Sequence, residues 1–169
     1  MKRLIYLFAA VTLLTSCTTD GGAPSDTPQG EVNQGQSAEG SGNLPVVSGE
    51  PGQAPELSAP TGEPPSELTI QDLFEGSGAT ASADSTLTVH YTLMAWSTGE
   101  VVESSWGGEP ATFGLNQVIL GWQQGIPGMK EGGRRLLVIP PQLGYGEAGG
   151  GPIGPNETLI FVVDIIAVS

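Results

Sequence analysis

Apolar and polar residues alternate strictly along residues 86–93, whose sequence is Thr-Leu-Thr-Val-His-Tyr-Thr-Leu. Neighbouring side chains of a β-strand point to opposite faces of the sheet, so every second residue shares a face. The apolar side chains of this stretch therefore lie together: Leu87, Val89, Tyr91 and Leu93. The alternation predicts a half-buried strand whose apolar face rests on a core.

Three further stretches have the composition of strands. Residues 101–104 follow a Ser-Thr-Gly-Glu turn at 97–100, and residues 134–139 contain four consecutive aliphatic side chains before two prolines. Residues 158–168 are rich in β-branched side chains, which pack well in sheets. One side of that last stretch has Leu159, Phe161, Val163 and Ile165. We expect a strand at each of the three places.

Only one stretch has helical spacing. Trp122 lies four residues after Val118 and three residues after Ile119. Ile126 follows Trp122 by four residues, so the apolar side chains form one stripe on a short helix, and Gly125 with the next Pro-Gly pair ends it. Strands before and after a single short helix predict an α+β fold, with the helix packed on one face of an antiparallel sheet.

The first third of the chain has a different composition. Residues 18–66 contain no Lys, Arg, Trp, Phe or Tyr, but they contain seven acidic residues and many prolines and glycines. Such a segment buries too little apolar area to offset its loss of conformational entropy. We therefore predict a disordered acidic stalk at 17–66 and a folded domain at 67–169.

The leader at 1–16 has a short basic start followed by an apolar run that is too short to span a bilayer as a mature helix. Leu14-Thr15-Ser16-Cys17 resembles the lipobox of bacterial lipoproteins, in which the cysteine is acylated after the leader is cut off. This resemblance implies a lipid-anchored protein on the extracytoplasmic face of the cell membrane. The alternative is a plain signal peptide followed by an incidental cysteine.

Charge and the absence of catalytic motifs exclude several classes of function. The formal net charge is −13, so the chain has no electrostatic footprint for nucleic acid or for an anionic membrane surface. It contains one histidine, one cysteine and none of the common nucleotide-binding, zinc-protease or nucleophile-elbow motifs. His90 lies on the polar face of its predicted strand, as an ordinary surface residue does. Any catalysis should therefore need no charged catalyst.

Several spaced motifs resemble the FKBP-type prolyl isomerases, in the right order and over residues 68–169. They are Val89-His90-Tyr91-Thr92, Glu103-Ser104-Ser105, Val118-Ile119-x-Gly121-Trp122-x-x-Gly125-Ile126-x-x-Met129, Gly132, Ile139-Pro140-x-x-x-Gly144-Tyr145-Gly146 and Ile153-x-Pro155-x-x-Thr158-Leu159-x-Phe161. The resemblance implies an antiparallel sheet of five or six strands wrapped around the short helix. It also implies a hydrophobic proline pocket between them.

The family pattern assigns roles to residues of that pocket. Trp122 would be its floor, the Ile119 N–H and the Tyr145 hydroxyl would bind peptide carbonyls, and Glu103 takes the place of the usual aspartate. The residues implied in catalysis are Tyr91, Val102, Glu103, Ile119, Trp122, Tyr145 and Phe161. Those implied in substrate binding are Val118, Ala111 and Ile153. Val102 and Ala111 stand where aromatic residues are common in the family, and Pro152 replaces an aliphatic residue.

The resemblance implies a peptidyl-prolyl cis-trans isomerase that acts on exported polypeptides without a metal or other cofactor. Its expected partners are proline-containing exported chains and macrolide inhibitors, and we expect a monomer. Two other interpretations stay open at this stage. The domain could be a non-catalytic module that holds proline-containing segments, or the protein could be a purely structural envelope lipoprotein. By spacing alone, Val118, Trp122 and Phe161 are ordinary core residues.

Overall fold

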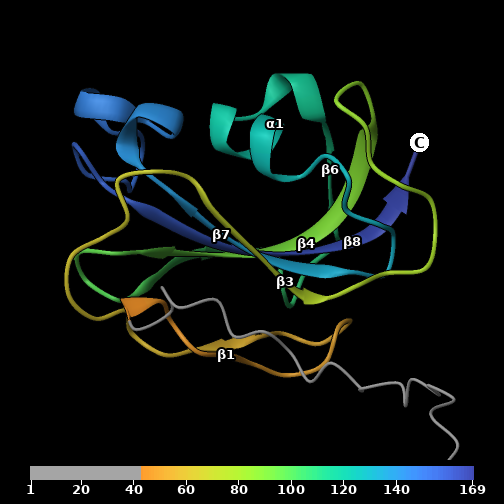
Figure 1. Cartoon of the computed structure of the whole chain (residues 1–169), viewed down its shortest axis with the longest axis horizontal. Helices are drawn as coiled ribbons and strands as arrows, with labels where there is room; N and C mark the ends of the chain where they lie inside the picture. Colours follow the sequence, from red (N-terminus) through yellow and green to blue (C-terminus); the bar gives the residue numbers. More distant parts are fainter. Residues whose placement is uncertain (1–42) are drawn as a thin grey trace, which may run out of the picture. The chain divides into compact units, whose positions relative to one another are not determined.

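The computed structural model describes residues 43–169, so the predictions for the leader, for Cys17 and for the stalk up to residue 42 lie outside the described residues. Six strands form one antiparallel sheet (Figure 1). The order along the main path is β3 (Thr69–Phe74), β7 (Arg134–Ile139), β8 (Leu159–Val168), β4 (Thr86–Ala95) and β5 (Val101–Ser104). The sixth strand, β6 (Ala111–Gly114), pairs with the first half of β4.

Within residues 44–169 the helices are short and all follow β6 in the chain. They are η2 (Leu115–Gln117), α1 (Leu120–Gly125), η3 (Pro141–Leu143) and η4 (Gly146–Ala148). Helix α1 lies over one face of the sheet, so the predicted α+β architecture is confirmed (Figure 1). Val118 and Ile119 precede α1 rather than forming its first turn. No helix within residues 43–169 is long and apolar enough to cross a membrane.

The main core lies between α1 and the sheet. The predicted apolar faces of β4 and β8 both point into it, with Leu87, Val89, Val163 and Ile165 almost fully buried. Helix α1 adds Trp122, and Ile126 follows at its end. The packing of α1 on the sheet thus places the indole of Trp122 against the centre of the sheet.

Close approach of α1 to β7 depends on two glycines. A Cβ atom added at Gly121 would lie 2.4 Å from Cγ2 of Ile139, and one at Gly125 would lie 2.7 Å from Cδ2 of Leu137. Real side chains do not tolerate such distances without a shift of the helix or of the strand. The two glycines therefore set the depth at which Trp122 sits.

Residues 43–66, which we call the strap, correct the predicted boundary between stalk and domain. Within the strap, β1 (Val47–Ser48) and β2 (Glu56–Leu57) pair as a small antiparallel ribbon on the sheet face opposite α1 (Figure 1). Leu44, Val47 and Leu57 pack there on a second core cluster. That cluster contains Met94, Trp96, Leu136, Val138, Ile160 and Val162. The strap thus buries the side of the sheet that would otherwise expose six apolar side chains.

A buried ion pair attaches the strap to the sheet. Arg134 is fully buried, and its Nε donates to Oδ1 of Asp164 at 2.6 Å while Nη2 donates to Oδ2 at 2.8 Å. Its remaining donors reach the carbonyl oxygens of Gly49 at 2.7 Å and Gln53 at 2.5 Å. The Gly52 N–H donates to Oδ2 of Asp164 at 3.0 Å. A buried guanidinium needs such complete pairing, so the strap is ordered despite its few apolar residues.

Candidate active site

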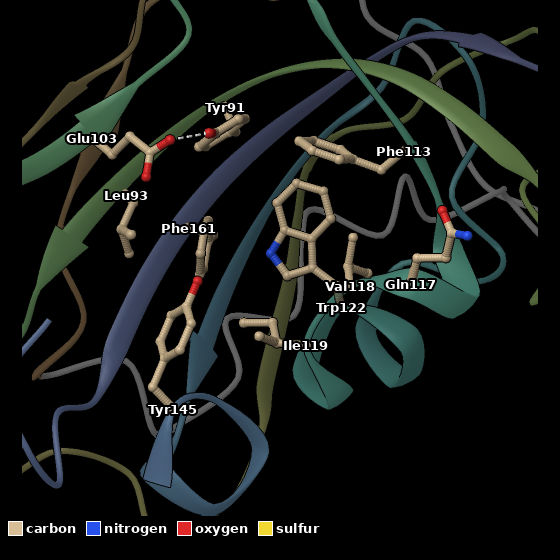
Figure 2. A pocket seen from close by; sticks show the side chains of 10 residues that line it. All are labelled: Tyr91, Leu93, Glu103, Phe113, Gln117, Val118, Ile119, Trp122, Tyr145 and Phe161. Atoms are coloured by element: carbon tan, nitrogen blue, oxygen red, sulfur yellow. Dashed lines mark hydrogen bonds between the residues drawn. The ribbon is translucent and has the colours of Figure 1, made fainter. Parts of the chain in front are cut away.

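A cavity of about 430 Å³ opens beside α1, above the face of the sheet that α1 covers (Figure 2). Strands β4, β5, β6 and β8 supply its sheet side, and the η2–α1 segment and the loop before η4 supply the rest. Its lining residues are Tyr91, Leu93, Glu103, Phe113, Gln117, Val118, Ile119, Trp122, Tyr145 and Phe161. Most of these side chains are apolar or aromatic, so the cavity suits an uncharged ring.

Three aromatic rings surround the Trp122 indole. Tyr91, Phe113 and Phe161 lie with their centroids 5.9, 6.0 and 5.3 Å from it, and each ring is nearly perpendicular to it. Edge-to-face contacts of this kind are favourable because the ring edges are positive and the ring faces are negative. Trp122 is only 4% exposed, yet it borders the cavity, and its Nε1–H has no hydrogen-bond partner within residues 43–169. The indole is thus a buried aromatic floor beneath an accessible hollow.

Tyr91 and Glu103 form the polar corner of the cavity (Figure 2). The Tyr91 hydroxyl donates to Oε1 of Glu103 at 2.5 Å. Burial, then this hydrogen bond and the negative charge of Glu103, raise the pKa of Tyr91 far above its ordinary value. The phenol therefore remains a donor over the whole physiological range, and the hydrogen bond fixes the ring that forms one wall.

Ser105 fixes the backbone next to this wall. Its Oγ accepts a hydrogen bond from the Tyr91 N–H at 2.9 Å and lies 2.9 Å from Nδ1 of His90. The His90 ring stacks on Trp106, with centroids 4.2 Å apart, and borders a different hollow from that of Trp122. His90 is absent from the lining of the Trp122 cavity, in line with its expected position on the polar face of the strand.

Two hydrogen-bonding groups lie at the cavity without a partner in the described part of the chain. The Ile119 carbonyl accepts from the Trp122 and Gln123 N–H groups, whereas the Ile119 N–H has no acceptor within residues 43–169. Tyr145 is 42% exposed, and its hydroxyl points into the cavity from the loop (Figure 2). A backbone donor and a phenolic hydroxyl thus face the space where a peptide would lie.

Seven of the ten residues expected at the site line the cavity, and three do not. Val102 packs against the main core, Ile153 is a core residue that is 7% exposed, and Ala111 pairs with Val89 across the sheet. None of these three belongs to the cavity lining. The structure adds three residues that the sequence analysis did not assign to the site: Leu93, Phe113 and Gln117.

Phe113 supplies the aromatic ring that Ala111 lacks. The two residues are separated by one position on β6, so they share a face of the strand. The alternation of residues 111–114 was a signal that could have identified Phe113. Leu93 could have been found in the same way, since the predicted strand already placed it on the face of Tyr91.

Comparisons with known proteins agree with this geometry. Residues 78–166 match the family model described as FKBP-type peptidyl-prolyl cis-trans isomerase. An FK506-binding protein of Streptomyces anulatus is 54% identical over 121 residues, which covers 69% of this chain and 98% of the relative. A probable FK506-binding protein of Corynebacterium glutamicum is 44% identical over 116 residues and is matched over 98% of its length. The crystal structure of FkpA from Escherichia coli superposes with a TM-score of 0.58 at 39% identity, covering 60% of this chain and 48% of that one.

Proposed function

The chain belongs to the FKBP-type peptidyl-prolyl cis-trans isomerases and is an isomerase of X-Pro bonds, and from this premise we propose how and where it acts. The proposal is that the Trp122 cavity excludes water from a prolyl amide and binds its twisted state in exported proteins at the cell envelope. The observation that supports it most is the buried aromatic floor beneath an open hollow.

Amide resonance explains why exclusion of water accelerates the rotation. The C–N bond has partial double-bond character, so rotation has a barrier of about 18–20 kcal/mol. The planar amide is more polar than the twisted one, because the carbonyl oxygen loses negative charge when resonance is lost. Water therefore stabilises the planar ground state, and a cavity walled by Tyr91, Phe113 and Phe161 removes that stabilisation. Rotation transfers no proton, so the step requires no acid or base.

Selective binding of the twisted state requires that the flanking peptide stays fixed while the prolyl bond turns. The Ile119 N–H and the Tyr145 hydroxyl are the groups that we assign to the peptide carbonyls on the two sides of the bond. Both groups lie at the cavity, and neither has a hydrogen-bond partner within residues 43–169. The proline ring then rests on the indole of Trp122.

We assign the protein to the extracytoplasmic face of the cell membrane, with a lipid on Cys17. This assignment rests on the sequence alone, through the leader and its lipobox-like end. An anchor with more than one acyl chain is stable because each buried CH₂ contributes about 0.8 kcal/mol. The substrates in this proposal are proline-containing segments of exported polypeptides.

A protease-coupled isomerisation assay on residues 18–169 tests the activity. We expect acceleration of the cis-to-trans step of an Ala-Pro peptide, and inhibition by an FK506-type macrolide, a ligand class suggested by the names of the relatives. Acceleration without macrolide inhibition would leave the mechanism intact and contradict only the ligand assignment. Peptide binding without any acceleration would show a non-catalytic module and would overturn the proposed mechanism.

A further inference from the structure

Glu103 is the one charged side chain among the ten residues that line the cavity. Its Oε1 accepts the hydrogen bond from Tyr91, and it forms no ion pair with any residue of 43–169. The side chain is exposed at the mouth of the pocket, where Figure 2 shows it beside Tyr91 and Leu93. The cavity thus has an uncompensated negative charge at one corner of an otherwise neutral lining.

The cations of the described residues all lie elsewhere. Lys130 pairs with Glu75 at 2.7 Å, Arg134 is buried against Asp164 beneath the strap, and Arg135 pairs with Asp72 at 2.6 Å. None of the three lines the cavity. Residues 43–169 contain fourteen acidic side chains against these three cations, a formal net charge of −11 with His90 neutral. The net charge of the whole domain therefore has the same negative sign as the Glu103 carboxylate at the pocket.

The residues that flank a bound proline must come close to this corner. Consecutive Cα atoms are about 3.8 Å apart across a trans peptide bond. A proline ring that rests on Trp122 is also beside Tyr91, whose hydroxyl is 2.5 Å from the Glu103 carboxylate. A lysine has a flexible four-carbon stem, so an ammonium group next to the proline can reach Glu103 from the adjacent position.

We propose that Glu103 makes the pocket selective for prolines that have a cationic neighbour in the substrate chain, and that it disfavours prolines with an acidic neighbour. The inference rests on the proposed binding of proline over Trp122 and adds the substrate class to it. Two unit charges about 6 Å apart in water change a binding constant by about threefold, and the opposite charges of Lys and Glu double that effect on a logarithmic scale, to about tenfold between the two substrates.

The test uses the detergent-solubilised full-length chain and peptides of the form Ala-X-Pro-Phe and Ala-Pro-X-Phe, with X as Lys, Ala or Glu. At low ionic strength we expect kcat/KM to be about tenfold higher for Lys than for Glu in at least one of the two positions. Added salt at about 1 M should reduce the ratio to about twofold, because the screening length falls to about 3 Å. Glu103→Gln should reduce the low-salt ratio by about fourfold.

The matched control is Glu56→Gln, which removes the same charge from β2 of the strap, on the sheet face opposite α1. It should leave the Lys-to-Glu ratio within twofold of the unsubstituted chain. The role of Glu103 would be overturned if Glu103→Gln and the unsubstituted chain had the same Lys-to-Glu ratio of kcat/KM. It would also be overturned if Glu56→Gln lowered that ratio as much as Glu103→Gln does. A chain that fails to accelerate even the Ala peptides would instead contradict the proposed function, so the two failures are distinguishable.

Discussion

Tyr91 combines a partly buried aromatic wall with a hydrogen-bond donor at the mouth of the cavity. Its ring contacts Trp122, Phe113 and Phe161, and its hydroxyl is held by Glu103. Burial disfavours the charged phenolate, and the carboxylate beside it disfavours a second negative charge still further. The protonated hydroxyl is therefore part of the folded site and not an incidental surface group.

This arrangement predicts that Tyr91 of the folded chain adds no tyrosinate absorbance in an alkaline titration. At about pH 11, one unit above the ordinary tyrosine pKa of about 10, the folded chain and Tyr91→Phe should show the same tyrosinate absorbance. Because the unfolded chain loses this proton first, the stability of the unsubstituted chain should also decline as pH rises above about 10, and more steeply than that of Tyr91→Phe. A larger tyrosinate signal in the unsubstituted folded chain would contradict the raised pKa.

Prediction of the cavity lining agrees with the structure where strand or helix period and the family motifs coincided, as at Tyr91, Trp122 and Phe161. It failed at Val102, Ala111 and Ile153, where positions were carried over from the family pattern without a strand register. A shift of two residues along β6 moves the aromatic ring from position 111 to Phe113 on the same face. Sequence spacing identifies the face of a strand on which a side chain lies. Which side chain of that face reaches the cavity depends on the register between the strand and its neighbour.

At the scale of elements, α1 approaches β7 closely because two glycines, Gly121 and Gly125, face the strand. Gly121→Ala should lower the free energy of unfolding by about 1–2 kcal/mol, since overpacking costs about 1–3 kcal/mol and the gain in helix propensity returns part of it. Gln124→Ala, on the exposed side of the same helix, is the control and should change stability by less than about 0.5 kcal/mol. Equal denaturation midpoints for the two variants would show that the close packing does not constrain α1.

The strap is the element that sequence composition missed. Its few apolar residues predicted disorder, but three of them meet a long-range partner surface on the sheet. Its backbone carbonyls satisfy Arg134, a contact between residues more than 80 positions apart that no local pattern contains. The edge strand β3 and the short β6 were also missed, because β3 has no strict apolar alternation and the alternation of β6 extends over only four residues. In contrast, β5 and β7 begin and end where their composition predicted.

Removal of the strap should therefore weaken the fold. Residues 67–169 should be less stable than residues 43–169 by about 2–4 kcal/mol, because Arg134 loses two carbonyl partners and the second core cluster becomes exposed. Urea denaturation of the two fragments measures the difference, with residues 18–169 as the control that should match 43–169. A fragment of 67–169 as stable as 43–169 would mean that the strap contacts contribute nothing net.

At the scale of the whole molecule, we propose that an acidic isomerase domain is joined to a lipid on Cys17. A chain with a formal net charge of −13 gains nothing from electrostatic attraction to anionic lipid. In this proposal, membrane attachment therefore depends on the acyl chains. The leader and residues up to 42 lie outside the described residues, so this part of the account is a prediction from the sequence.

We expect Cys17→Ser to abolish incorporation of labelled palmitate and to move the protein out of the membrane fraction in a bacterial host. The isomerase activity of the released chain should match that of the unsubstituted chain in detergent, since Cys17 lies outside the folded domain in this account. The control is Ser16→Ala, which retains the thiol and should be labelled normally. Persistent membrane association and labelling of Cys17→Ser would contradict the lipid assignment.

The most direct test of the desolvating aromatic pocket compares one substitution at two buried tryptophans. Trp122 borders the cavity and is 4% exposed, whereas Trp96 is 8% exposed in the cluster beneath the strap. We predict that Trp122→Leu lowers kcat/KM for an Ala-Pro peptide by about tenfold or more, about 1.4 kcal/mol of transition-state stabilisation. Trp96→Leu should lose comparable stability and retain activity within about twofold. Equal activities for the two variants, with both folded, would contradict the pocket as the site of catalysis.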